Sequence, residues 1–175
     1  RFVDLVREGV DCVVRAGVLA DSDMVARPLG AMEEVTVASP DYLARHGIPA
    51  TPEDLEGHQM IGFISSRTGQ PLPLEFTRGD EVIEVMLPTR LLVSGAETSA
   101  AGVLQGFGLV QAPRYRFIDD LANGNLIEVL TDFPPTPTPL SVLYPSNRQL
   151  SPRVRVFVDW LVEVIGSGLL PSREV

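Results

Sequence analysis

Short apolar runs alternate with amphipathic or capped segments along most of the chain. Residues 1–8 carry apolar side chains at helical spacing with charges on the opposite side, which predicts a short helix. The mostly apolar run 10–14 predicts a strand covered on both faces. Residues 17–27 are rich in turn formers and are interpreted as a loop, and the β-branched run 34–38 predicts another strand.

Two helix starts follow closely. Ser39-Pro40-Asp41 offers a hydroxyl cap, a proline in the first turn and an acid at the positive end of the helix dipole, and Gly47 can end that helix. Thr51-Pro52-Glu53-Asp54 repeats the pattern for a second short helix. Downstream, the pattern predicts strands at 59–64, 91–93, 108–112, 126–130 and 140–144, a hairpin of 71–77 and 81–87 turning at Arg78-Gly79-Asp80, and helices at 94–105 and 114–121.

Pro152 opens the last helix, whose expected apolar stripe consists of Val154, Phe157, Val158, Leu161, Val162 and Ile165. Trp160 lies near Phe157 on this helix and is expected to pack in a core or between lobes rather than to serve as a ligand platform. Strands and helices alternate from end to end. This order predicts an α/β fold with largely parallel strand pairing.

Composition narrows the possible functions. A chain of 175 residues with 45% hydrophobic residues can build a real core, and a net charge of -9 argues against nucleic-acid binding by this segment. All 14 basic residues are arginine, so Schiff-base chemistry and a phosphate-loop lysine are excluded. The uncharged run 98–113 is too short and too glycine-rich to span a bilayer, so no membrane partner is expected.

Groups for catalysis or metal binding are sparse. The single cysteine, Cys12, lies in an apolar run and is interpreted as a small buried hydrophobe. His46 and His58 stand beside glycines in loop-like surroundings, where surface positions are expected. We therefore expect no catalytic residues, no metal site, no cofactor and no enzymatic activity.

The segment Ser94-Gly95-Ala96-Glu97-Thr98-Ser99 is the first candidate binding site. It opens a helix directly after a strand, where free backbone N–H groups and the helix dipole can hold a carboxylate or phosphate. The alternative is a plain helix cap made by Ser94, Thr98 or Ser99, with Glu97 complementing the dipole. A cap residue can also line a ligand site, so both interpretations stay open.

A second candidate is Phe63-Ile64-Ser65-Ser66-Arg67, which leaves a strand at its carboxyl end, where ligands bind in open α/β sheets. The two hydroxyls could orient a polar ligand and Arg67 could clamp a carboxylate, unless this is simply a solvated loop. Arg15 could reach a ligand or pair with Asp11 or another acid, and the pairing is slightly favoured. On its chemistry alone, Pro113 is interpreted as a residue that ends its strand.

Five segments, in order, resemble the effector-binding domain of LysR-type transcription regulators: DLVREGVDCVVRAG, LGAMEEVTVASPDYLARHGIPATPEDLEGHQMI, SGAETSAAGVLQGFGLVQAPRY, LANGNLIEVL and LSVLYPSNRQLSPRVRVFVDWL. The resemblance implies a two-lobed fold similar to type 2 periplasmic binding proteins, with two crossing hinge strands and a small-molecule site in the cleft. It also implies that Pro113 forms part of the lobe II wall of that site. Lobe I would hold residues 1–39 and 144–175, and lobe II residues 40–143. The family's domain begins with a further strand and helix, so lobe I is expected to be incomplete at its N-terminus.

The resemblance also implies a function. It points to a cytoplasmic sensor that binds a small effector, an organic acid or an aromatic metabolite, and acts as a homodimer or tetramer. DNA would be contacted only through a winged helix-turn-helix that is not in this chain. The alternative is an extracytoplasmic solute-binding protein of the same fold. The motif order, especially SPDYLARHGIPATPEDL, favours the regulator.

Overall fold

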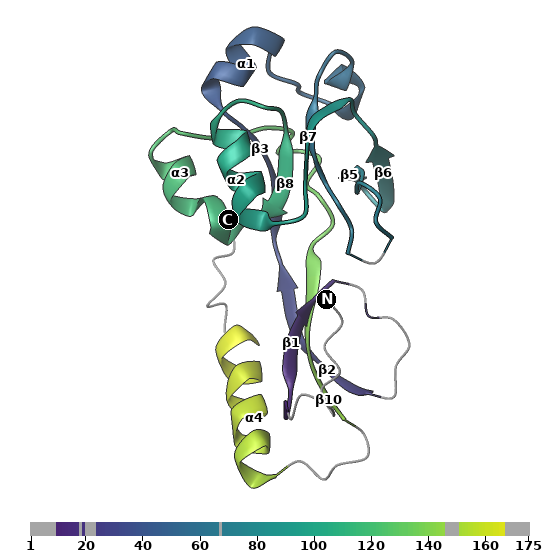
Figure 1. Cartoon of the computed structure of the whole chain (residues 1–175), viewed down its shortest axis with the longest axis vertical. Helices are drawn as coiled ribbons and strands as arrows, with labels where there is room; N and C mark the ends of the chain where they lie inside the picture. The colour runs from purple at the N-terminus through teal and green to yellow at the C-terminus, as the bar shows by residue number, and fades with distance from the viewer. Residues whose placement is uncertain (1–9, 18, 20–23, 67, 146–150, 167–175) are drawn as a thin grey trace. The chain divides into compact units, whose positions relative to one another are not determined.

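The chain forms two compact units in a computed structural model that describes residues 10–17, 19, 24–66, 68–145 and 151–166 (Figure 1). Unit 1 comprises Arg1–Met32 and Pro137–Val175, and unit 2 comprises Glu33–Thr136. The chain therefore passes between the units twice, after Met32 and after Thr136. The helix predicted at 1–8 lies outside the described residues.

Unit 1 is an antiparallel sheet with a helix packed on it. Its strands are β1 (Val13–Ala16), β2 (Met24–Met32) and β10 (Thr138–Pro145), in the order β1-β10-β2. Helix α4 (Pro152–Gly166) runs beside this sheet (Figure 1). The apolar core between them consists of Leu29, Met32, Leu140, Val142, Val154 and Val158, with Cys12, Leu161, Val162 and Ile165 packed against it.

Several predictions for unit 1 are wrong. Phe157 does not join the apolar stripe of α4 and Trp160 does not lie in the core, because they are 46% and 52% exposed while Val154 and Val158 face the sheet. The strand predicted at 10–14 begins only at Val13, and its residues are alternately half-buried and exposed, because within the described residues β1 is an edge strand of an antiparallel sheet. The loop predicted at 17–27 ends earlier than expected, since β2 already begins at Met24. Residues 24–27 are held extended by pairing with β10, a long-range partner that local turn propensity does not reveal.

Unit 2 carries most of the predicted elements close to their expected places. Its strands are β3 (Glu34–Ala38), β4 (Met60–Phe63), β5 (Leu74–Arg78), β6 (Glu81–Val85), β7 (Thr89–Val93), β8 (Val110–Pro113) and β9 (Ile127–Glu128). Its helices are α1 (Pro40–His46), η1 (Pro52–Leu55), α2 (Ala96–Leu104), η2 (Arg114–Phe117) and α3 (Ile118–Ala122). The predicted hairpin is confirmed as β5 and β6, which pair antiparallel around Gly79 and Asp80.

The strands of unit 2 pair mostly antiparallel, so the expectation of largely parallel pairing is wrong. Strand β3 pairs antiparallel with both β8 and β9, and among the described strands only β4 and β7 form a parallel ladder. The connection between β4 and β7 contains the predicted β5–β6 hairpin rather than the helix that commonly joins parallel strands. A single parallel bridge between Met60 and Leu109 brings β8 alongside β4.

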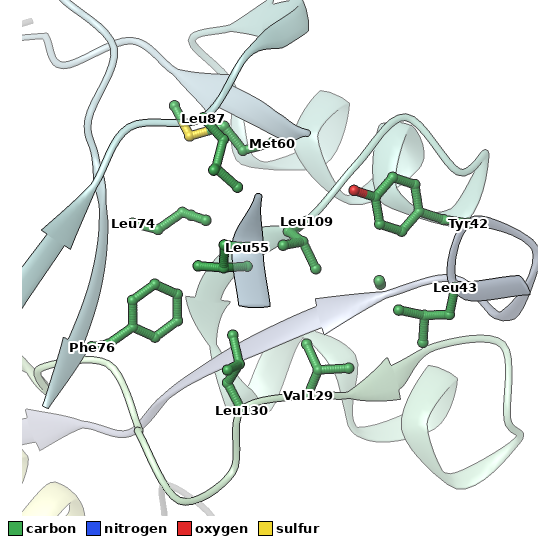
Figure 2. Close-up of a cluster of buried hydrophobic side chains, with 11 residues drawn as sticks. Tyr42, Leu43, Leu55, Met60, Leu74, Phe76, Leu87, Leu109, Val129 and Leu130 are labelled. Atoms are coloured by element: carbon green, nitrogen blue, oxygen red, sulfur yellow. The ribbon is translucent and has the colours of Figure 1, made fainter. Parts of the chain in front are cut away.

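Two apolar cores stabilise unit 2. One is formed by Ala38, Tyr42, Leu43, Leu55, Met60, Leu74, Phe76, Leu87, Leu109, Val129 and Leu130. Figure 2 shows side chains of this core converging from α1, β5 and the segment after β9. The other is formed by Val35, Val37, Ile61, Val93, Val103, Val110, Phe117 and Leu126, and it joins α2 to the strands. Gly102 permits close packing here, because a Cβ at this position would lie 2.8 Å from the Leu91 side chain.

The two helix starts predicted after β3 are confirmed. The Ser39 hydroxyl accepts a hydrogen bond from the Tyr42 N–H at 3.2 Å and caps α1, and the helix ends at Gly47 in a positive-φ conformation. At η1, the Asp54 carboxylate accepts from the Thr51 N–H at 2.8 Å and the Ala50 N–H at 3.1 Å. These hydrogen bonds lower the pKa of Asp54.

The two histidines do not lie in surface loops as expected. His58 is only 4% exposed, and its Nδ1 lies 3.1 Å from the Tyr42 hydroxyl. The same hydroxyl accepts from the Gln59 N–H at 2.8 Å, and the half-buried His46 ring stacks on Tyr42 at 4.4 Å between ring centroids. The prediction was wrong because Tyr42, sixteen residues away from His58, offers a buried hydrogen-bond partner.

Acidification should weaken unit 2 through His58. Burial, followed by the nearby charge of His46, lowers the pKa of His58 below its ordinary value, against the opposing effect of Asp54. The unfolded chain then binds this proton more readily than the folded chain. The stability contribution is therefore complete above the unfolded pKa of about 6.5 and is lost as the pH falls through the lower folded pKa.

A His58→Gln variant tests this expectation. Urea unfolding at pH 7.5 and pH 5.5 should show a smaller loss of unfolding free energy in the variant than in the unmodified chain. The comparison is made between two pH values within each protein, so a uniform cost of the substitution cancels. Equal losses in both proteins would show that His58 does not carry the effect.

None of the helices in the described residues has the length and apolar character needed to cross a lipid bilayer.

Candidate functional site

The carboxyl ends of β4 and β7 lie side by side in unit 2. Their parallel register pairs Phe63 with Val93, and the Ile64 N–H donates to the Val93 carbonyl at 2.7 Å. The chain segments that follow, beginning at Ser65 and Ser94, therefore leave the sheet at the same edge. This is the position where ligands bind in open α/β sheets.

Helix α2 begins at this edge with free backbone donors. Its N-cap is Gly95, and within the described part of the chain no side chain makes a capping hydrogen bond to it. The predicted cap by Ser94, Thr98 or Ser99 is therefore wrong: Ser94 and Thr98 are exposed, whereas Ser99 is buried one turn further on. Glu97 does lie in the first turn, as the same alternative expected. The N–H groups of the first turn thus remain available to an acceptor brought by a ligand.

An ion pair flanks the start of α2. Glu97, in the first turn, pairs with Arg116 of η2, whose side chain is 19% exposed whereas that of Glu97 is 91% exposed. The hydrogen bond to Glu97 raises the pKa of the Arg116 guanidinium. Arg116 was not predicted as a site residue. Its position just after Pro113, at the carboxyl end of a strand, was the available signal.

The segment after β4 folds back on itself as a tight turn. The Ser65 N–H donates to the Gln70 carbonyl at 2.9 Å, and the Ser65 carbonyl accepts from the Gly69 N–H at 2.8 Å. The Ser65 hydroxyl accepts a long hydrogen bond, 3.4 Å, from the Thr68 N–H. Ser65 is half-buried and Ser66 is exposed, so both hydroxyls stand at or near the surface of unit 2.

Pro113 ends β8 at the same edge, since β8 runs parallel to β4 at the Met60–Leu109 bridge. The next residue, Arg114, donates to the Glu33 carboxylate at 2.9 Å and to the Glu128 carboxylate at 2.7 Å. Burial opposes the charge of Arg114, but these hydrogen bonds outweigh it and raise the pKa of the guanidinium. Arg114 thereby ties the end of β8 to the beginning of β3 and to β9.

The structure brings most of the predicted site residues to this one edge: Phe63, Ser65, Ser66, Ser94, Gly95, Glu97, Thr98 and Pro113. Arg67 lies outside the described residues. Arg15 is half-buried in β1 of unit 1, in register with Ser141, and its role stays a prediction. Among the described residues, no group of three or more His, Cys, Asp or Glu side chains could hold a metal ion. Backbone N–H groups, hydroxyls and a guanidinium suit a small anion.

Comparison with known proteins gives the fold class. The chain resembles the regulatory domain of CrgA, a LysR-type transcriptional regulator from Neisseria meningitidis, with a TM-score of 0.75 and 32% identity over 94% of this chain and 79% of that one. It also resembles the full-length virulence activator AphB of Vibrio cholerae, with a TM-score of 0.76 and 26% identity over 93% of this chain and 54% of that one. The fold is the two-lobed, periplasmic-binding-protein-like α/β fold of such regulatory domains.

Sequence comparison gives the family. Residues 1–166 match the LysR substrate binding domain, and the chain belongs to this family. It is 38% identical to the uncharacterized HTH-type transcriptional regulator YhjC of Escherichia coli K12, over 94% of this chain and 55% of that protein. The chain spans about half the length of the curated relatives that it matches. Because these relatives are transcriptional regulators, the alternative of a solute-binding protein is not favoured.

Proposed function

We propose that this chain is the sensory domain of a cytoplasmic, LysR-type transcription factor and that it binds a small organic acid at the carboxyl edge of β4 and β7. Effector binding would be transmitted to a DNA-binding domain carried elsewhere in the full-length protein. The protein that contains this chain would act as a homo-oligomer. As a regulator rather than a catalyst, it would bind its effector without turning it over.

The observation that carries the proposal is the uncapped start of α2, which faces the same edge as Ser65. Gly95 brings no side chain, so a carboxylate can approach the N–H groups of the first turn. The Thr98 hydroxyl, exposed in that turn, can donate to the same ligand. Arg116 adds positive charge nearby, although Glu97 offsets part of it.

A ligand of this kind switches a regulator only if it binds one conformation better than another. Differential binding is possible at this edge because the loop after β4 and the first turn of α2 meet there but belong to separate segments of the chain. An effector that contacts both segments would favour the arrangement in which its two sets of partners are satisfied together.

A thermal-shift screen against small carboxylates tests the proposal. A carboxylate supplied at about 100 times its dissociation constant should add about 2.7 kcal/mol to the unfolding free energy. Thr98→Ala should remove one hydrogen bond to a charged acceptor, worth about 1.5 kcal/mol, so about half of the gain should remain at the same ligand concentration.

Thr131→Ala is the matched control, because Thr131 is equally exposed but lies in the turn after β9. The control should keep the whole gain, and both variants should unfold near the midpoint of the unmodified chain when no ligand is present. A gain of equal size in the unmodified chain and in Thr98→Ala would place the ligand elsewhere.

A further inference from the structure

The two arginines of η2, Arg114 and Arg116, hold their carboxylate partners in different ways. Both partners of Arg114 are half-buried, since the side chain of Glu33 is 31% exposed and that of Glu128 is 20% exposed. Glu97, the carboxylate on Arg116, is 91% exposed, although the arginine itself is only 19% exposed. Arg114 is therefore fixed between parts of the fold, whereas the partner of Arg116 can turn into water without moving a strand.

The pair between Arg116 and Glu97 also leaves guanidinium donors unused. One nitrogen of Arg116 donates to one oxygen of Glu97. Arg78, by contrast, reaches both oxygens of Glu53, at 2.6 Å and 2.8 Å. A guanidinium binds a carboxylate most strongly through two parallel hydrogen bonds. A ligand carboxylate is not tethered to the helix backbone, so it can adopt the bidentate geometry that Glu97 does not reach.

Arg116 keeps its positive charge at this edge. The hydrogen bond to Glu97 raises the pKa of the guanidinium, burial opposes this effect, and the Tyr115 side chain adds to it. A partly buried guanidinium needs an acceptor, so it favours a carboxylate partner at all times. Exposed ion pairs contribute little to stability, so replacing Glu97 with another acid disturbs the fold little.

We propose that Arg116 binds the carboxylate of the effector and that Glu97 is an internal counter-ion which the effector displaces. The inference rests on the proposed effector site, because it assigns roles to two residues of the same edge. Glu97 lies in the first turn of α2, so its carboxylate already occupies the place beside Arg116 that an acidic ligand needs. Binding exchanges one carboxylate for another on the same guanidinium, and the displaced Glu97 turns into water.

This exchange makes the site selective for ionised acids. An uncharged relative of the effector cannot displace Glu97, because the guanidinium would lose its anionic partner. An acid must compete with a carboxylate that the chain itself holds near Arg116 at a high effective concentration. The counter-ion therefore lowers the affinity for every acid and excludes neutral ligands.

Amide NMR titrations with acetate and benzoate test the exchange, with sodium chloride at the same ionic strength as the reference. Glu97→Gln should tighten the binding of both acids about threefold to tenfold, because the tethered competitor is gone. Arg116→Gln should weaken it about tenfold or more. Glu56→Gln removes the same charge from an exposed position before the amino end of β4 and should leave both affinities within about twofold of the unmodified chain.

The carboxyl carbon of Glu97 reports the displacement itself. Its ¹³C signal, identified by its loss in Glu97→Gln, should move on saturation with benzoate toward its position in ligand-free Arg116→Gln, where this ion pair is absent. Repulsion between two acids would change the affinities without breaking the ion pair, so the signal separates competition from repulsion.

The outcomes distinguish the exchange from the site on which it rests. Acids that perturb the amides of residues 96–98 but bind the unmodified chain and both variants equally would overturn the exchange and leave the effector site in place. A Glu97 signal that keeps its paired position in the saturated complex would also overturn the exchange. Acids that perturb amides only elsewhere, or none at all, would overturn the effector site and the exchange together.

Discussion

Replacing Gly108 with alanine should cost unit 2 about 3 kcal/mol or more of unfolding free energy. Gly108 adopts a φ of +148°, which side-chain-bearing residues rarely adopt, and an added Cβ would lie 2.7 Å from the Gln59 carbonyl oxygen. The obstacle is backbone, so no side-chain rotation can relieve it. The clash falls where the Leu109 N–H donates to Gln59 and the Ile61 N–H donates to Leu109, the bonds that hold β8 against β4.

Gly79→Ala is the control for this prediction. Gly79 also has a positive φ, +62°, but nothing lies within 4 Å of an added Cβ there. Its substitution should therefore cost only the conformational strain, about 1 kcal/mol. Urea unfolding followed by circular dichroism measures both variants. Similar costs for the two would mean that the close approach of β8 to β4 is not a tight constraint.

Gly95→Asp should abolish most of the response to a bound carboxylate. The φ of Gly95 is −121°, and the nearest atom to an added Cβ is the Thr98 hydroxyl oxygen at 3.8 Å, so the substitution fits the fold. An aspartate side chain at this N-cap would accept hydrogen bonds from the free N–H groups of α2. It would also place a negative charge where the carboxylate of the ligand is expected. The affinity should fall about 100-fold or more.

The free protein should respond in the opposite direction, with a gain of about a few tenths of a kcal/mol from the added cap. Gly95→Asn separates charge from hydrogen bonding, because asparagine caps the helix without a charge. The fold loss of ligand affinity in Gly95→Asn should be about tenfold smaller than the fold loss in Gly95→Asp. Isothermal titration with the carboxylate found in the thermal-shift screen measures both affinities. An aspartate variant that binds as tightly as the unmodified chain would remove α2 from the site.

Much of the fold of unit 2 could be predicted because its signals are local. The caps at Ser39 and Asp54 bond to backbone within a few residues, and the hairpin turn at Gly79 lies between its two strands. Such features need only short-range geometry, which the order of residue types specifies.

Strand direction and edge positions could not be predicted in the same way. β2 is extended because β10, more than a hundred residues away, pairs with it. The alternation of helices and strands suggested parallel pairing, but β3 is antiparallel to both of its neighbours. His58 was misplaced for a related reason, since its burial depends on Tyr42 rather than on its own glycine-flanked context.

The parts of the candidate site that lie at the ends of strands and at the start of a helix could be predicted from the sequence. The pairing of Phe63 with Val93 places the two predicted segments at one edge, as their positions after successive strands suggested. The arginines of η2 were missed, because an ion pair such as that between Arg116 and Glu97 joins residues far apart in the sequence. The one local signal, its position just after Pro113 at the end of a strand, does not by itself distinguish Arg116 from a solvated surface arginine.

Hydrogen exchange with and without the bound carboxylate tests the central claim most directly. If the effector binds at the start of α2 and the loop after β4, the amides of residues 96–98 and 65–66 should exchange more slowly in the complex, while those of the β5–β6 hairpin keep their rates. A carboxylate that stabilises the chain yet leaves both segments unprotected, and protects amides elsewhere, would contradict the assignment of this edge as the effector site.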